Sequence, residues 1–151
     1  MSATGGKTPS IDERIMMAIV RVSERFKRKS AAIFTDYGLS FSQYNALRLL
    51  GNLPGGRGSI TEISHQLLVS TPNMSGIAKR LEKAGFVSRS RDMGDERRTI
   101  LQLQPPAKQV LKNIQGLQEK NIKMFLASCP LGQKRAFLDL LKGMLQSDAP
   151  L

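Results

Sequence analysis

Residues 61–103 read TEISHQLLVSTPNMSGIAKRLEKAGFVSRSRDMGDERRTILQL, and this stretch decides the fold. Its first half contains two amphipathic segments on either side of Val69-Ser70, which predicts a helix, a tight turn and a second helix. In its second half, apolar and polar residues alternate at 86–91 and again at 99–104. This alternation predicts a two-stranded β-ribbon with its tip at residues 92–98. A helix-turn-helix followed directly by a ribbon can place one helix in the major groove of DNA and a hairpin beside it.

The second helix of this motif has two different faces. Thr71 is expected to cap it, and Pro72 stands at its first position, where the missing N–H costs nothing. Gly85 is expected to end it. The inner stripe is apolar and follows helical spacing: Met74, Ile77, Ala78, Leu81 and Ala84. The outer face is polar and, with the preceding turn, supplies the candidate DNA contacts: Ser70, Thr71, Pro72, Asn73, Ser75, Gly76, Lys79, Arg80 and Lys83.

The early turns of this helix are suited to reading bases. Asn pairs with adenine through two hydrogen bonds, Lys bonds guanine, and Ser bonds several bases, which makes Asn73, Ser75 and Lys79 candidates for base contacts. Arg80, Lys83 and Ser70 are better suited to phosphate contacts, which position a protein without reading sequence. A solvated polar face is the alternative interpretation, and the ribbon that follows argues against it.

The ribbon supplies a second set of candidates, with Arg97 the strongest. A guanidinium at a hairpin tip can enter the minor groove, where the negative potential increases as the groove narrows. Asp95 is expected to orient Arg97 through a charge-assisted hydrogen bond. The remaining arginines of the ribbon are predicted phosphate contacts: Arg89, Arg91 and Arg98.

Composition favours an acidic partner. The 151 residues carry a formal charge of +11 at an isoelectric point near 10.3, which favours nucleic acid over a membrane surface. The charge is spread along the chain, because residues 1–60 hold nine basic and four acidic side chains whereas residues 61–99 hold seven and five. The basic run at residues 25–29 is interpreted as a solvated helix face that can raise the rate of association.

Several other classes of site find little support. Cys129 is the only cysteine, so an intramolecular disulfide is impossible, and an inert thiol is favoured over a redox sensor. His65 is the only histidine, which disfavours a metal site. We find no phosphate loop, nucleophile elbow or paired-acid motif, so no catalytic residue and no cofactor are expected. Without a signal peptide or an apolar run of about 18 residues, the protein is expected in the cytoplasm.

The flanking segments predict long helices. Residues 1–9 are expected to be a disordered tail. Ser10 and Glu13 fit a capping box, after which apolar residues at helical spacing predict one helix as far as Gly38, roughly 40 Å long. A second helix follows Ser40 or Ser42, and then a flexible loop at 51–58. Ser59-Ile60 is expected to form a very short strand, and Thr61 to cap the first helix of the motif. After the ribbon, one helix begins at Pro105-Pro106 and ends near Cys129-Pro130, and the last spans Leu131 to Gln146.

This order of elements resembles the MarR family of winged helix-turn-helix regulators. Three segments carry the resemblance: LSFSQYNAL at 39–47, RLEKAGFVSR at 80–89, and Asp92-x-x-Asp95-x-Arg97 with the strand after it. In that family the β-ribbon, here residues 86–104, is called the wing. The chain departs from the family pattern after the wing, where LQPPA at 103–107 replaces Leu-Thr-x-x-Gly. It also lacks the N-terminal cysteine of the family's peroxide sensors.

The resemblance implies a mainly α fold with a small β-ribbon. Residues 39–104 would form the winged helix-turn-helix domain, embedded between dimerisation helices at 10–38 and 105–148. It also implies a homodimer that binds double-stranded DNA and responds to a small anionic aromatic effector. The effector pocket would lie where the first helix, the second helix and the helix after the wing meet, lined by Met17, Arg21, Phe41, Tyr44 and Arg48.

We therefore expect a sequence-specific transcriptional regulator, most simply a repressor that binds a pseudo-palindromic operator. The diffuse charge would also suit a nonspecific architectural DNA-binding protein, and a preference for one sequence over bulk DNA separates the two. A protein-interaction adaptor that has kept the fold without reading DNA is a third class. Asn73, Lys79 and Arg97 argue against it.

Overall fold

The computed structural model describes residues 8–146, in two compact units that divide after Gln118. Residues 1–7 of the predicted tail and the last two residues of the predicted segment 105–148 lie outside the described residues. The helices are α1 (Ile11–Thr35), α2 (Phe41–Asn52), α3 (Ile60–Leu67), α4 (Thr71–Lys83), α5 (Pro105–Phe125) and α6 (Leu131–Gln146). The strands are β1 (Arg57–Ser59), β2 (Val87–Arg91) and β3 (Thr99–Leu103), and a 3₁₀ turn, η1, spans Pro54–Gly56. The mainly helical fold with a small sheet is confirmed.

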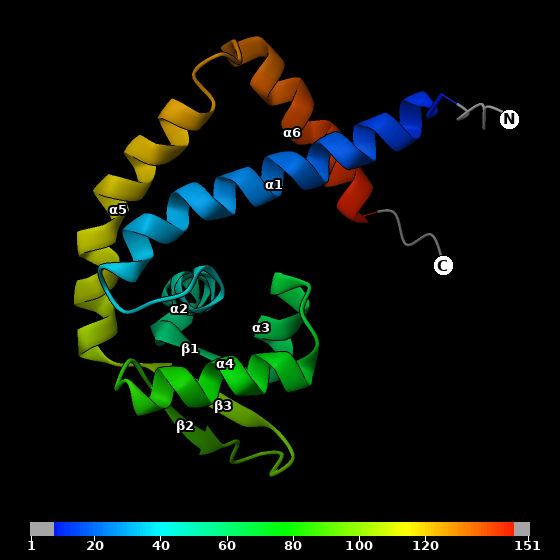
Figure 1. Ribbon diagram of the computed structural model, residues 1–151. Coiled ribbons are helices and arrows are strands. Elements are labelled where there is room, and N and C mark those ends of the chain that lie inside the picture. Colours follow the sequence, from blue (N-terminus) through cyan, green and yellow to red (C-terminus); the bar gives the residue numbers. More distant parts are fainter. Residues whose placement is uncertain (1–7, 147–151) are drawn as a thin grey trace, which may run out of the picture. The chain divides into compact units, whose positions relative to one another are not determined.

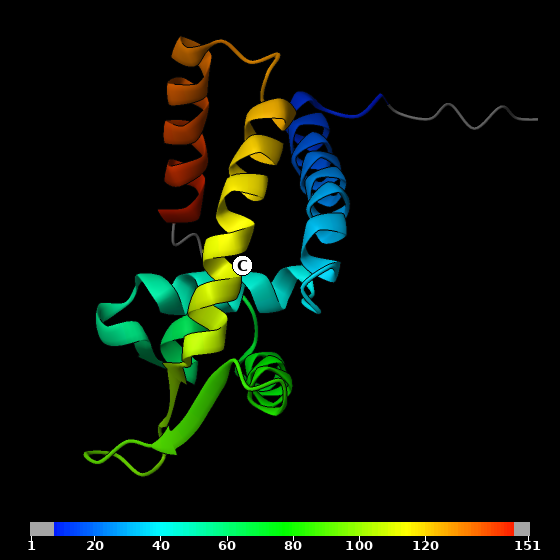
Figure 2. The ribbon, with the colours of Figure 1, turned by 90° about the vertical axis from the view of Figure 1, so that its left-hand side faces the viewer.

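The sheet has three strands: the two of the predicted ribbon, and a short one close to where the sequence predicted it. β3 lies in the centre, with antiparallel β1 on one side and β2 on the other. The extra strand is Arg57–Ser59 and not Ser59-Ile60, because Ile60 already begins α3. Much of the predicted flexible loop is therefore ordered: the Gln102 side chain donates to the carbonyl of Gly55 at 2.8 Å, which anchors η1 to β3. Beyond the three strands, the β2–β3 hairpin projects away from the helices (Figures 1 and 2).

Serine hydroxyls begin four of the helices. Ser10, Ser40, Ser59 and Ser70 each accept a hydrogen bond from the backbone N–H three residues later. The predicted caps Thr61 and Thr71 are therefore wrong, since the residues before each helix that remain extended are Ser59 and Ser70. Pro72 consequently stands at the second helical position, which also needs no N–H partner. The reciprocal capping box forms at Ser40 and Gln43, whereas at Ser10 the structure shows the serine half.

Helix α1 ends three residues before the predicted stop. Asp36 is its C-terminal cap, and Gly38 then reverses the chain with a φ of +69°. Three of the apolar residues whose helical spacing predicted α1 are exposed, namely Ile11, Ile15 and Val22. Phe34, in contrast, is completely buried.

The core of the first unit is built around aromatic stacking between α1 and α2. The rings of Phe34 and Tyr44 stack with centroids 4.0 Å apart and planes within 17°. Most of the remaining buried apolar residues come from α2, α3, α4, β2, β3 and α5, among them Leu47, Leu50, Ile63, Met74, Ile77, Leu81, Leu101 and Ile114. The buried side chain of Gln118 donates to Ser30 Oγ at 3.2 Å, which fastens this part of α5 to α1. The core therefore joins the long helices to the helix-turn-helix in one body.

The second unit is described as residues 119–146. Helix α5 ends at Phe125, four residues before the predicted end, and the chain then turns so that α6 runs back (Figure 2). The predicted bounds of α6 are confirmed, and none of its 16 residues is buried. Among residues 8–146, no helix is both long and apolar enough to span a lipid bilayer.

Substitutions at two turn residues with positive φ are expected to change the free energy of unfolding in opposite directions. Leu68 ends α3 in the left-handed region, at a φ of 53° and with 77% of its surface exposed. Because this conformation costs a residue with a Cβ about 1–2 kcal/mol, Leu68→Gly should raise the free energy of unfolding by about 1 kcal/mol.

Gly38→Ala is the matched control. A Cβ at Gly38 would meet no atom within 4 Å, so the cost of this substitution is conformational alone. It should lower the free energy of unfolding by about 1 kcal/mol. Urea denaturation monitored by circular dichroism measures both changes, and a Leu68→Gly protein less stable than the parent would contradict the prediction.

Candidate nucleic-acid interface

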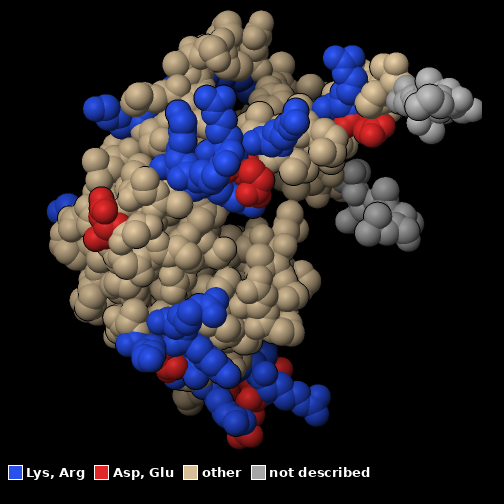
Figure 3. All heavy atoms as spheres, viewed as in Figure 1, with Lys and Arg blue, Asp and Glu red and all other residues tan. Residues whose placement is uncertain are grey.

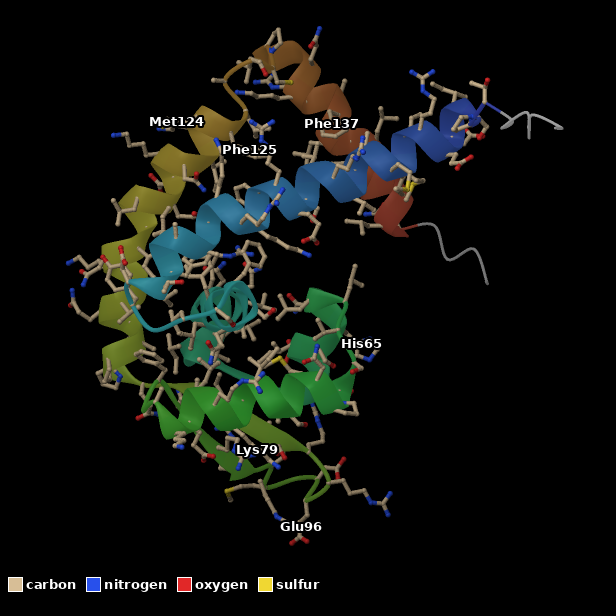
Figure 4. All side chains as sticks on the ribbon, viewed as in Figure 1. His65, Lys79, Glu96, Met124, Phe125 and Phe137 are labelled. Atoms are coloured by element: carbon tan, nitrogen blue, oxygen red, sulfur yellow. The ribbon has the colours of Figure 1, made fainter. Side chains whose placement is uncertain are left out.

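Helix α4 presents its polar face to solvent because its apolar face is buried. Met74, Ile77, Ala78 and Leu81 are in the core as predicted, whereas Ala84 is exposed because it caps the helix instead of continuing it. The predicted contact residues lie on the other side: Ser70, Thr71, Pro72, Asn73, Lys79, Arg80 and Lys83 are exposed, and Ser75 and Gly76 are half-buried. In Figure 4, Lys79 lies on the side of α4 that faces away from α2 and α3. These residues therefore share one accessible surface.

The start of α4 is held by hydrogen bonds that involve three of the candidates. Ser70 Oγ accepts from the N–H of Asn73 at 3.3 Å. Thr71 Oγ1 lies 3.4 Å from the hydroxyl of Ser64, a buried residue of α3. These contacts connect the two helices of the motif and set the direction in which Asn73 leaves the first turn.

The tip of the wing is shaped by two aspartates that bind backbone. Asp92 Oδ1 accepts from the N–H of Gly94 at 3.1 Å, and Asp95 Oδ1 accepts from the N–H of Arg97 at 3.0 Å. The expectation that Asp95 would hold the Arg97 guanidinium is therefore not what the structure shows, since the carboxylate binds the backbone instead. Short acidic side chains readily accept from the N–H two residues ahead, and this competes with a longer-range ion pair. Asp95 shapes the turn from which Arg97 projects.

The four arginines of the wing fall into two groups, according to whether their side chains have partners within the described residues. Arg98 Nη2 donates to Ser59 Oγ at 3.3 Å, and its Nη1 lies 3.8 Å from Asp92 Oδ2. Arg89 Nε lies 2.6 Å from Glu82 Oε2 of α4. In contrast, Arg91 and Arg97 are exposed, and neither forms an ion pair in the described part of the chain. The charges of Arg91 and Arg97 are therefore not neutralised by an ion pair with a described residue.

The distribution of charge has two centres on the first unit. Basic side chains gather over α4 and the hairpin, with acidic ones among them, and a second group covers α1 (Figure 3). The α1 group includes exposed Arg14, Arg21, Arg25 and Arg28. An open hollow of about 240 Å³ lies on the wing itself, lined by Arg89, Ser90, Arg91 and Thr99. A phosphate could enter it from the solvent side.

The five residues predicted to line an effector pocket do not all come together. The Phe41 ring lies 6.2 Å from Phe26 and 5.9 Å from Phe34, and Tyr44 stacks on Phe34 in the core. Met17 and Arg21 lie on the exposed first half of α1, about 13 and 7 Å along the helix from Phe26. Arg48 is exposed on α2. The structure therefore groups Phe41 with Tyr44 and places the three polar or flexible candidates on the surface.

Other chemistry gains no support from the geometry. Within residues 8–146, no three His, Cys, Asp or Glu side chains are grouped so that they could hold a metal ion. Cys129 is half-buried in the segment between α5 and α6, where its thiol lies 3.9 Å from the carbonyl of Pro130.

Sequence reasoning missed two residues of the interface. Glu82 pairs with Arg89, and Ser59 both caps α3 and accepts from Arg98. A signal for Glu82 was present, since an acid in the last turn of a helix and a base on the strand after a tight turn can face one another. For Ser59 there was no such signal, because its contact with Arg98 joins residues 39 positions apart.

Comparison with known proteins finds similarity to a family of regulators. The family model described as MarR matches residues 39–99, which run from the start of α2 to the start of β3. The transcriptional regulator TtmR of Methylorubrum extorquens is 29% identical over 145 residues, which cover 95% of this chain and 72% of that regulator. These matches agree with the family resemblance seen in the sequence, and the matched relatives are named as transcriptional regulators.

Solved structures support the fold. The MarR-family regulator Sco3205 of Streptomyces coelicolor, crystallised in complex with DNA, superimposes with a TM-score of 0.85 at 16% identity, over 98% of this chain and 94% of that one. Bordetella bronchiseptica BpsR, whose DNA binding is regulated by 6-hydroxynicotinic acid, superimposes with a TM-score of 0.82 at 18% identity, over 94% of this chain and 100% of that one. At these identities the likeness concerns the fold. The winged helix-turn-helix predicted from residues 61–103 is confirmed.

Proposed function

We propose that this chain is a MarR-family transcriptional regulator, a repressor that binds a pseudo-palindromic operator in double-stranded DNA as a homodimer. The observation that carries the proposal is the presence of two exposed elements in one compact unit: the polar face of α4, and Arg97 on a wing tip shaped by Asp95. Asn73, Ser75 and Lys79 are the side chains proposed to read bases in the major groove. Arg97 enters the adjacent minor groove, and Arg80, Lys83 and Arg91 contact phosphates.

The homodimer is proposed because the single chain exposes apolar surface that a second copy could bury. Helix α6 exposes Leu131, Leu138 and Leu145, which are spaced by seven residues and therefore lie on one side of the helix. The first half of α1 separately exposes Ile11, Ile15, Met16 and Val20. A soluble monomer rarely exposes this much contiguous apolar surface, and a second copy of the chain can cover it.

Dimer symmetry sets the form of the operator. A two-fold axis relates the two α4 helices, so each reads one half-site, and the half-site centres lie about 10 bp apart. The contacts to phosphates make the affinity fall steeply with salt.

We further propose that a small anionic aromatic molecule relieves repression. BpsR, which shares this fold, is regulated by such a compound, and Arg21 and Arg48 are exposed cations on the two helices that meet at Phe26 and Phe41. The effector acts by binding more tightly to a dimer whose two reading helices are spaced wrongly for the operator.

Replacement of Arg97 tests the reading of DNA. Duplexes selected from a random-sequence pool provide the operator, and fluorescence anisotropy with a scrambled competitor measures the affinity. Arg97→Ala should lose about 1–3 kcal/mol of binding free energy, because the minor-groove contact is lost. Arg14→Ala on α1 is the matched control and should bind the operator as the parent does. A parent protein with equal affinity for selected and scrambled DNA would instead indicate the architectural alternative.

Replacement of Leu138 tests the dimer. A buried carboxylate at an apolar interface is strongly unfavourable, so Leu138→Glu should shift the protein from dimer towards monomer in sedimentation velocity and weaken operator binding. Gln133→Glu introduces the same charge on the opposite side of the same helix and should remain dimeric. A Leu138→Glu protein that sediments as the parent does would exclude α6 from the interface.

Replacement of Arg21 and Arg48 tests the effector site. The ligands are a panel of hydroxylated aromatic carboxylic acids that includes 6-hydroxynicotinic acid, and calorimetry measures their binding. Arg21→Ala or Arg48→Ala should weaken any acid that binds, because a charge-assisted contact to its carboxylate is lost. Arg28→Ala is the control on α1. Unchanged affinity in both variants would remove these arginines from the site.

A further inference from the structure

The ion pair between Glu82 and Arg89 connects the recognition helix to the wing. Glu82 lies in the last turn of α4, and Arg89 is the third residue of β2. Arg89 Nε donates to Glu82 Oε2 at 2.6 Å, a short distance for an ion pair. Both side chains are partly buried, at 29% and 39% exposed, which strengthens the pair relative to one in open water.

The connection between α4 and β2 is short and needs a support of this kind. Only residues 84–86 separate the helix from the strand, and Gly85 reverses the chain there with a φ of +77°. The N–H of Gly85 donates to Glu82 and that of Phe86 to Leu81, so the backbone of the turn is fixed at its helical end. Beyond the turn, the hydrogen bond between the side chains of Arg89 and Glu82 connects β2 to α4.

Arg89 is poorly suited to the phosphate contact that its sequence position suggests. Its charge is neutralised at short range by Glu82, and a phosphate approaching the pair would meet a carboxylate as well. Arg91 is better suited to a phosphate contact than Arg89. It lies two residues further along β2 on the same face, is exposed, and forms no ion pair among the described residues. The two arginines line one hollow, but of the two only Arg89 forms an ion pair among the described residues.

We propose that Glu82 and Arg89 are positioning residues that hold the wing at a fixed angle to α4, so that both elements reach one half-site together. This inference rests on the proposed function. The helix and the wing contact different grooves, so a loose joint between them would have to be ordered when DNA binds. That ordering would lower the affinity even though no DNA contact is removed. The partly exposed pair adds little to global stability.

Charge-neutral variants of the two partners give results of opposite sign for the two possible roles. If Arg89 binds phosphate, Glu82→Gln removes a repulsive charge and should tighten DNA binding. If the pair positions the wing, Glu82→Gln and Arg89→Gln should each weaken operator binding by about three- to tenfold. The double variant should then lose no more than either single variant, because both changes break one interaction.

The salt dependence of binding provides a second and independent readout. Arg89→Gln should leave the slope of log affinity against log salt unchanged, whereas Arg91→Gln should reduce it by about one, as expected for one lost phosphate contact. Arg89→Lys retains the positive charge and should recover part of the operator affinity. Thermal unfolding of each variant checks that the fold is intact.

The outcomes separate this inference from the proposed function. Tighter binding by Glu82→Gln, additive losses in the double variant, or a reduced salt slope in Arg89→Gln would overturn the positioning role while the operator model stands. A parent protein without sequence preference would overturn the proposed function, and the inference would fall with it because no half-site would exist for the wing to meet.

Discussion

Burial of one apolar stripe on α4 is the constraint on which the rest of the site depends. Met74, Ile77, Ala78 and Leu81 are each at most 2% exposed, and they pack into the core that holds Phe34, Tyr44, Leu47 and Ile63. Burying each large side chain stabilises the fold by roughly 1.5–3 kcal/mol, which far exceeds the effect of any single surface contact on α4. The helix cannot rotate without exposing this stripe. The orientation of Asn73 and Lys79 towards solvent is therefore a consequence of packing on the opposite side.

The wing shows how acidic residues can serve a surface meant for DNA. Residues 92–98 contain three acids and two arginines, so the tip has no net positive charge of its own. Two of the acids are occupied within the hairpin, because Asp92 and Asp95 each accept a backbone N–H two residues ahead. Glu96 lies exposed at the end of the hairpin (Figure 4). Attraction to DNA over long range must come from the rest of the basic surface, and the tip contributes the geometry of Arg97.

Much of the fold could be predicted because its signals are local. Helical spacing of apolar residues predicted α4 and its inner stripe, alternation predicted β2 and β3 to within one residue, and the bounds of α6 were correct. Capping was predicted less well, since serine and threonine stand close together before α3 and α4 and both can cap. Ser59 caps α3 because the pairing of β1 with β3 keeps its backbone extended. Ser70 caps α4 because its backbone is extended, whereas Thr71 is already the first residue of the helix. The assignment of 10–38 and 105–148 to dimerisation remains a prediction, as do the individual DNA contacts.

The sequence by itself determined the class of protein and the set of side chains offered to DNA, because periodicity, turn residues and the motif at 80–97 are written along the chain. Only the tertiary structure decided which of those side chains keep their charge for a partner. Arg89 and Arg98 look equivalent to Arg91 and Arg97 in the sequence. Glu82, Asp92 and Ser59 engage the first two, whereas Arg91 and Arg97 form no ion pair within residues 8–146. Likewise, Tyr44 was predicted to line a pocket and instead stacks on Phe34. Such pairings depend on distances between residues of different helices and strands, and those distances are set by how the elements pack rather than by their order.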